Sequence, residues 1–210
     1  MLNIIKLIIV TSAWIFANQA DHLLLTRVVT QPTKAESFSI TNPTEMPIDL
    51  TNYYVSDAQE YYKIAQYPDS TFSNPISGFT AKFPAIIINP SETLIIALHE
   101  EYKDFYGDNF NADLVMFGST DNSLTGSIGQ GSQGIIHQTK ELIILFYWDN
   151  QDDLLVQDVD YFTWGNYHKQ INKTDSLNYK DDTLPENQAS FAYKAREYYA
   201  YSRFNLDEDN

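Results

Sequence analysis

The side chains best suited to chemistry form an acidic turn in the second half of the chain. Asp149, Asp152 and Asp153 stand close together and could offer carboxylate oxygens to Ca²⁺, a hard cation that favours such ligands. The turn does not follow the EF-hand pattern, because Leu154 stands where that pattern requires glycine. An acid-rich turn between two strands is also typical of an ordinary solvated surface. The sequence therefore leaves open whether these three residues hold a cation, and we assign no metal ligand.

A glycine-rich segment at residues 129–134 has the G-x-G-x-x-G spacing of a dinucleotide-binding loop. Such a loop needs a strand before it and a helix after it, because the helix N-terminus holds the pyrophosphate. Here a stretch rich in Ser, Thr and Asn precedes the glycines, and a predicted strand follows them. We therefore expect a flexible loop over residues 119–134 and no cofactor.

The histidines and serines form no local catalytic or metal motif. None of His22, His99, His137 and His168 is paired at zinc spacing, and no serine stands in G-x-S-x-G. His99 precedes two glutamates and could ligate a metal, but a solvated strand end is the commoner setting for such a residue. Triads and paired carboxylates join residues that are distant in sequence, so a sequence does not display them. We assign no catalytic residue and predict that the chain is not an enzyme.

Tyrosine is unusually frequent, with 15 residues, and forms three doublets, at 53–54, 61–62 and 198–199. An exposed tyrosine is rigid, broad and amphipathic, which suits recognition of a ligand. In a doublet on a strand, one ring faces inward and the other outward. The outward rings either bind a partner or simply cover the sheet, and the sequence does not decide between these interpretations.

The composition excludes several classes of function. The 210 residues include 28 acidic and 13 basic side chains, for a formal net charge of -15. A chain this acidic is repelled by nucleic-acid phosphates and anionic lipid, so we expect neither as a partner. Hydrophobic residues make up 43%, which is too many for a disordered chain. The absence of cysteine excludes disulfides, cysteine zinc sites and a thiol nucleophile.

Most of the chain consists of short apolar runs that predict strands. These runs are rich in β-branched and aromatic residues, and Asn-Pro or Asp-rich turns separate them. The predicted strands are 23–30, 36–41, 53–56, 61–67, 82–88, 93–98, 113–117, 141–148 and 155–164. No alternation of strand and helix is present, so the pattern indicates an all-β, antiparallel β-sandwich.

The last two predicted strands form a long hairpin. By the period-two rule, Val159 and Tyr161 share one face of the second strand, while Asp158 and Asp160 share the other. We expect the first face to enter a core and the acidic face to remain in water.

The ends of the chain differ from its middle. Residues 1–20 carry Lys6, then an apolar run, then small residues, which is the order of a signal peptide cleaved after Ala17 or Ala20. The apolar run is shorter than a membrane span requires, so no span is expected after cleavage. We therefore expect a secreted, periplasmic or cell-surface protein. Residues 166–210 are a polar extension, in which a capping box predicts a short helix over 186–197. The domain itself is then 21–165.

The order of several motifs resembles the lamin tail domain family. Residues 36–43 (ESFSITNP) resemble that family's strand ending in Asn-Pro, and 48–57 (IDLTNYYVSD) resemble its next strand, D-L-x-G followed by alternating aromatic and aliphatic residues and Asp. Residues 83–97 resemble its F-P and P-G-E-x-L motifs, and 142–147 with 156–161 resemble its closing hairpin. Asn52 and Ser91 stand where the family commonly has glycine.

The resemblance implies an immunoglobulin-like antiparallel β-sandwich acting as an accessory or adhesive module outside the cell. We therefore predict an exported, non-catalytic binding or surface module whose partner is a protein or a glycan. The alternative is a secreted hydrolase or a Ca²⁺-dependent carbohydrate-binding protein that uses the acidic hairpin from Asp149 to Asp160.

Overall fold

The regular secondary structure of the described residues consists almost entirely of strands. The computed structural model describes residues 19–66, 78–108, 110–116, 118, 121–128, 136–150, 156–165, 171, 173 and 194–207. Within these residues, helical structure is limited to the short α-helix α1 (Tyr102–Tyr106) and the 3-10 helices η1 (Thr33–Ala35) and η2 (Tyr61–Gln66). The prediction of an all-β protein is confirmed.

The strands are short and follow one another closely along the chain. In chain order they are β1 (Leu24–Val29), β2 (Ser37–Thr41), β3 (Ile48–Asp49), β4 (Tyr53–Ser56), β5 (Phe79–Lys82), β6 (Ile87–Ile88), β7 (Thr93–Ala97), β8 (Leu114–Met116), β9 (Ser123–Ile128), β10 (Glu141–Tyr147), β11 (Gln157–Trp164) and β12 (Ala200–Ser202).

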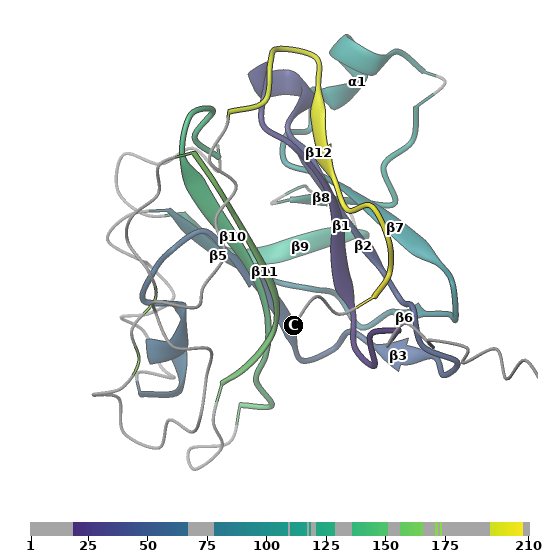
Figure 1. Cartoon of the computed structure of the whole chain (residues 1–210), viewed down its shortest axis with the longest axis vertical. Helices are drawn as coiled ribbons and strands as arrows, with labels where there is room; N and C mark the ends of the chain where they lie inside the picture. Colours follow the sequence, from purple (N-terminus) through teal and green to yellow (C-terminus); the bar gives the residue numbers. More distant parts are fainter. Residues whose placement is uncertain are drawn as a thin grey trace, which may run out of the picture.

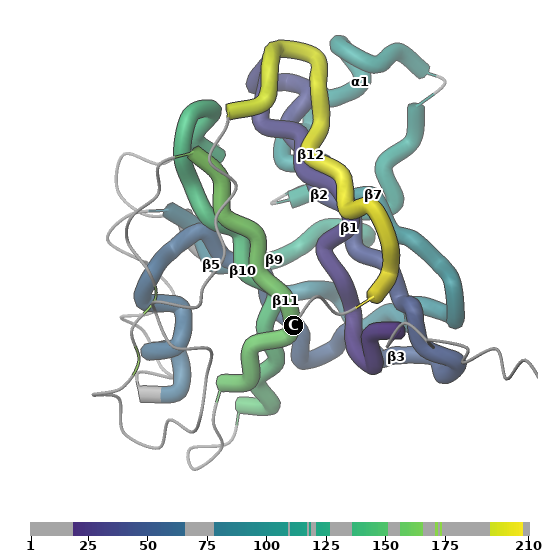
Figure 2. Tube along the Cα trace, in the orientation of Figure 1, coloured from purple at the N-terminus to yellow at the C-terminus, as the bar shows by residue number. Residues whose placement is uncertain are grey.

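Ten of these strands form one large curled sheet, in the order β11-β10-β4-β5-β9-β8-β7-β2-β1-β12. Its neighbours are antiparallel, except that β8 runs parallel to both β7 and β9, and β3 pairs separately with β6. The sheet folds over on itself, with β10 and β11 in one arm, β1, β2 and β7 in the other, and β9 crossing between them (Figure 1). The last described segment runs back along β1, where β12 adds the final strand (Figure 2).

Apolar side chains fill the concave side of the curled sheet. Where a strand is regular, its alternate residues point inward, as Phe38 and Ile40 do on β2 and Ile143 and Leu145 do on β10, and all four are fully buried. They join residues from both arms in one continuous core cluster, to which Trp164 also belongs. Burial of this cluster holds the two arms together.

A second apolar cluster covers the outer face of β10. Leu142, Ile144 and Phe146 alternate with the inward residues and are also fully buried, because η2, Val156 and Ile171 pack over them. This explains why β10 is an unbroken apolar run from Leu142 to Phe146: a strand that is covered on both faces needs apolar residues at every covered position.

The predicted hairpin forms, but the predicted arrangement of its faces is wrong. Leu145 pairs with Asp160 and Phe146 pairs with Asp158, so Val159 is an extra residue, a β-bulge. The bulge breaks the alternation, and Val159 packs against the inner cluster while Tyr161 packs against the outer one. Asp158 and Asp160 therefore lie on opposite faces of the sheet.

Four other expectations from the sequence also need correction. Residues 61–66 form the 3-10 helix η2 instead of a strand, and the predicted strand 82–88 divides between β5 and β6. The predicted loop 119–134 contains β9, while its glycine-rich residues 129–134 lie outside the described residues. Most of the predicted helix 186–197 also lies outside them, and its described part, 194–197, is not helical.

The predicted leader lies outside the described residues up to residue 18. Gln19 and Ala20 are described and contact the other end of the chain, since Gln19 bridges to Asp207 and the Ala20 amide donates to the Leu206 carbonyl at 3.0 Å. Among the described helices, none has the length and apolar character to cross a membrane.

Candidate functional site

Three side chains form a row at one end of the concave face of the sheet. Tyr147 on β10 is the register partner of both Tyr53 on β4 and Gln157 on β11. Register partners stand on the same face of a sheet, and Tyr53 packs against the inner core cluster. The row therefore continues the concave surface to the point where the core ends.

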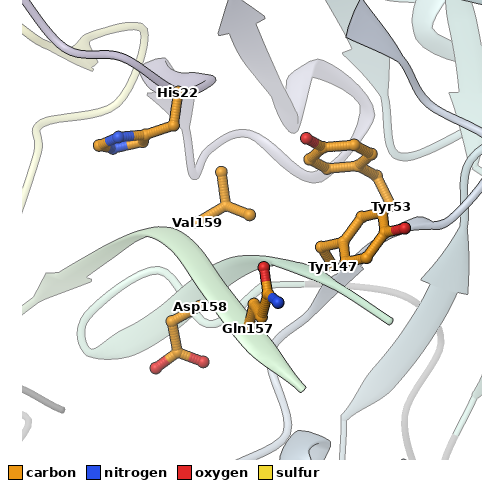
Figure 3. Close-up of a pocket in the computed structure, with 6 residues that line it drawn as sticks. All are labelled: His22, Tyr53, Tyr147, Gln157, Asp158 and Val159. Carbon is orange, nitrogen blue, oxygen red and sulfur yellow. The ribbon is translucent and has the colours of Figure 1, made fainter. Parts of the chain in front are cut away.

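This row forms one wall of a pocket of about 420 Å³. Its lining residues come from β4, β10, β11 and the segment before β1: His22, Tyr53, Tyr147, Gln157, Asp158 and Val159. Figure 3 shows His22 on one side, the two tyrosines on the other and Val159 between them. The volume lies within the usual range of small-ligand sites, which often occupy the open end of a curled sheet.

The two tyrosines hold each other in place. Their ring centroids are 5.4 Å apart at an interplanar angle of 72°, the edge-to-face geometry that aromatic pairs prefer. Burial, together with the neighbouring Tyr147, raises the pKa of the Tyr53 hydroxyl. The hydroxyl therefore remains neutral at physiological pH and can donate a hydrogen bond as well as accept one. The pocket thus combines two aromatic rings with a hydroxyl donor and the amide of Gln157.

The carboxylate of Asp158 lies apart from the tyrosine row. Its side chain points away from Tyr53 and Tyr147 (Figure 3), as expected for a residue on the opposite face of β11. There Oδ1 accepts a hydrogen bond from the Tyr61 hydroxyl at 2.5 Å, and Oδ2 accepts one from Lys173. The pocket therefore presents two aromatic rings and one side-chain amide, and its one lining carboxylate is bound to other partners.

Asp160, on the opposite face of β11, is also engaged in hydrogen bonds. Its Oδ2 accepts hydrogen bonds from the Leu25 amide at 2.7 Å and from Arg203 at 2.8 Å. Burial raises the pKa of Asp160, while the Arg203 charge and the Leu25 amide act in the other direction. Asp160 thus ties β11 to β1 and to the segment after β12.

The structure does not bring the acids of the hairpin together as one site. Asp158 and Asp160 face opposite ways, and each is bound to a basic side chain. Asp149 is described, whereas Asp152 and Asp153 lie outside the described residues. Among the residues that are described, no three His, Cys, Asp or Glu side chains cluster in a way that could hold a metal ion.

His99, the other metal candidate, pairs with a buried acid. Its Nε2 lies 3.3 Å from Oε2 of Glu36, a fully buried residue just before β2. Burial raises the pKa of Glu36, and the contact with His99 opposes that rise. The pair links β2 to the end of β7, which is a structural position, and the described residues around it include no third ligand.

Sequence reasoning found only part of this pocket. Tyr53 stood out as a member of a doublet, and its ring faces the inner side while Tyr54 packs in the outer cluster, as the alternation predicts. Tyr147 appeared only as the end of an apolar run, and Gln157 carried no signal. The register of β4, β10 and β11 brings the three together, and no local motif encodes it.

Comparison with known proteins adds a remote likeness only. No family model matches the chain, and no curated protein matches it. Among solved structures, a DUF4876 family protein from Bacteroides thetaiotaomicron is similar, with a TM-score of 0.44 and 13% sequence identity. The match covers 71% of this chain and 55% of that one, so the present chain spans about half of the other protein's length. The likeness identifies neither a family nor a function.

Proposed function

We propose that the chain is an exported, non-catalytic binding module of lamin-tail type, and that its ligand, a glycan or a protein, occupies the pocket at Tyr53, Tyr147 and Gln157. The observation that carries this proposal is the row of two rigid rings and an amide across three paired strands. Aromatic faces bind the C–H faces of a sugar ring or a flat peptide side chain, and the amide and hydroxyls add directional hydrogen bonds.

A neutral ligand suits this surface best. The formal net charge of -15 repels anionic ligands, and the nearest carboxylate, on Asp158, is engaged by Tyr61 and Lys173. Among neutral ligands, a sugar ring matches both the ring faces and the hydrogen-bonding groups. We therefore place glycans before proteins as the first class to test.

The turn residues of the lamin-tail motifs support the proposed fold type. Buried Asn42, of the Asn-Pro motif, donates to the carbonyls of Met46 at 2.8 Å and Ile88 at 3.1 Å. Ser91, at a position where the family commonly has glycine, adopts a φ of 63°, the left-handed conformation that glycine adopts most easily. In this proposal the two arms of the curled sheet correspond to the two layers of an immunoglobulin-like sandwich.

Export follows from the proposed leader. Among the two cleavage sites, the one after Ala17 keeps Gln19 and Ala20, which contact Asp207 and Leu206. N-terminal sequencing of protein recovered from the culture medium or cell envelope should read from Asn18. Recovery of the intact chain from the cytosol alone would contradict export.

The binding proposal can be tested with a glycan array followed by calorimetry on each ligand that binds. The Tyr147→Ala variant should weaken binding about tenfold or more, because a stacked ring contributes at least ~1.4 kcal/mol in such a site. Tyr199→Ala is the matched control, since Tyr199 is 61% exposed and does not line the pocket. Equal loss of binding in both variants, or binding unchanged by Tyr147→Ala, would refute the assignment.

The hydrolase or Ca²⁺-binding alternative relies on the acids between Asp149 and Asp160. Of these, Asp158 and Asp160 face opposite sides of the sheet and each is bound to a basic side chain, which does not favour joint action by these two. A shift of the melting temperature by several degrees with Ca²⁺, or turnover of an ester, glycoside or phosphodiester substrate, would establish the alternative.

A further inference from the structure

A lysine, an aspartate and a tyrosine meet in a buried position on the outer face of the hairpin. The side chain of Lys173 is 1% exposed and that of Asp158 is 20% exposed, while Tyr61 is fully buried. The amine of Lys173 donates to Oδ2 of Asp158, and the Tyr61 hydroxyl donates to Oδ1 at 2.5 Å. The lysine amine also lies 4.9 Å from the centre of the Tyr61 ring. These contacts lie on the outer face of β11, opposite the tyrosine row, although Asp158 also lines the edge of the pocket at Tyr147.

The surroundings of this group are apolar. Tyr61 belongs to the outer cluster, together with Phe146, Trp148 and Ile171, all of which are buried. Removing an ammonium and a carboxylate from water costs several kcal/mol per ion, and their mutual attraction often does no more than offset that cost. A reaction that removes both charges would remove the cost of burying two ions.

We propose that Lys173 and Asp158 condense to an intramolecular amide bond, which cross-links the segment after β11 to β11 itself. The cross-link goes beyond the proposed binding function and does not depend on it. The geometry supplies the two main requirements for such a step: the amine is held against the carboxyl group, and the carbonyl oxygen has a hydrogen-bond donor.

The step balances without an external reagent. Transfer of one proton from the ammonium to the carboxylate gives a neutral amine and a neutral carboxylic acid. The lone pair of Nζ then attacks Cγ of Asp158, and the Tyr61 hydroxyl stabilises the negative charge that develops on Oδ1. The Cγ–Oδ2 bond breaks, and Oδ2 leaves as water with one proton from the acid and one from the amine. Tyr61 is unchanged at the end.

The amino-acid composition indicates what such a cross-link would contribute to stability. The chain has no cysteine, so it cannot stabilise itself with a disulfide. An amide between residues 158 and 173 would close a loop in the same way as a disulfide does, and reducing agents would not open it.

Intact mass spectrometry of the purified, denatured full chain tests the proposal directly. The expected mass is lower than the sequence mass by one water molecule. The loss should disappear in Lys173→Met and in Asp158→Ala, and it should be slowed or lost in Tyr61→Phe. Lys140→Met serves as the matched control: Lys140 is exposed, so this variant should still have a mass one water molecule below its sequence mass.

Peptide mapping distinguishes the cross-link from other dehydrations. A branched peptide that joins Lys173 to Asp158 is the expected product. A cyclic imide at Asp158 would also lose one water, but it would survive in Lys173→Met and open in hydroxylamine. That pattern, or a wild-type mass equal to the sequence mass, would show that the two side chains form only an ion pair, and the proposal would be wrong.

Discussion

The contact between Asp160 and Arg203 closes the two edges of the curled sheet, and the two partners should respond very differently to mutation. Asp160 lies on β11, at one edge of the sheet, and Arg203 follows β12, at the other. Their side chains are 10% and 22% exposed, and Oδ2 of Asp160 lies 2.8 Å from Arg203. Removing Arg203 leaves a buried carboxylate without its counter-charge, whereas removing the charge of Asp160 leaves an arginine that can reach water.

The expected magnitudes follow from that asymmetry. Arg203→Met should lower the free energy of unfolding at neutral pH by about 3 kcal/mol or more, as for other buried pairs that lose one partner. Asp160→Asn keeps an oxygen that accepts from the Leu25 amide, so it should cost only about 1 kcal/mol. The double variant should resemble Asp160→Asn, because no buried charge remains in it.

The difference in stability between wild type and Arg203→Met should depend on pH. Burial already raises the pKa of Asp160, and loss of Arg203 raises it further, so the folded Arg203→Met variant binds a proton more readily than the unfolded chain does. Its stability is then greatest below the ordinary aspartate pKa and falls as pH rises through the raised value. The gap between wild type and Arg203→Met should therefore narrow as pH is lowered.

Urea unfolding followed by tryptophan fluorescence measures all four proteins at several pH values. Trp164 lies in the inner cluster and reports its exposure. The reasoning is refuted if Asp160→Asn costs as much as Arg203→Met, or if the gap between wild type and Arg203→Met does not change with pH.

Three further predictions concern the interior. Burial raises the pKa of Asp57 to about 8, so the contribution of this carboxyl group to stability declines as pH rises from 3.8 through about 8. Asp57→Asn should therefore melt at a higher temperature than wild type above about pH 8, and a difference in melting temperature that is the same at acid and alkaline pH would contradict this. A Cβ at Gly126 would lie 2.0 Å from the Thr80 carbonyl oxygen, so Gly126→Ala should lower the free energy of unfolding, measured by urea titration, by ~2–4 kcal/mol. A loss of less than ~1 kcal/mol would argue against so close an approach of β5 and β9. Trp164→Phe removes the indole N–H that donates to the His137 carbonyl at 2.9 Å, so it should lower the free energy of unfolding by ~1–3 kcal/mol in the same assay. An unchanged free energy of unfolding would mean that water replaces the donor.

The strands that the sequence predicted best are those whose core contacts dictate their composition. β10 is apolar at every position from Leu142 to Phe146 because clusters cover both of its faces, and β2 and β7 carry β-branched or aromatic residues that enter the core. In these segments local propensity and burial favour the same structure, so the sequence pattern is sufficient.

The strand β9 was missed for the opposite reason. Its sequence SLTGSI contains glycine and two serines, which is typical of a loop. Gly126 is needed there because the backbone of β5 approaches too closely for a Cβ. That requirement comes from a strand more than 40 residues earlier in the chain, so the local sequence pattern does not indicate it.

The 3-10 helix η2 shows how tertiary packing overrides local propensity. Tyr61, Tyr62 and Ile64 are β-formers by type. In the fold, the Tyr61 ring packs against Phe146 with their centroids 5.0 Å apart and reaches the carboxylate of Asp158. The segment therefore serves as a cover for the outer face of β10, and a strand at this position would place only alternate residues on that face.

The bulge at Val159 determines which faces of the sheet Asp158 and Asp160 occupy. Without the extra residue, Asp158 and Asp160 would share one face and repel each other. With it, Asp158 faces outward to Lys173, and Asp160 faces inward to Arg203. Gln157 and Val159 share the inner face by ordinary alternation, and both line the pocket. One irregularity of register thus separates the two acids and places each beside a basic residue, which is why a period-two rule applied to the sequence identified the right strand and the wrong faces.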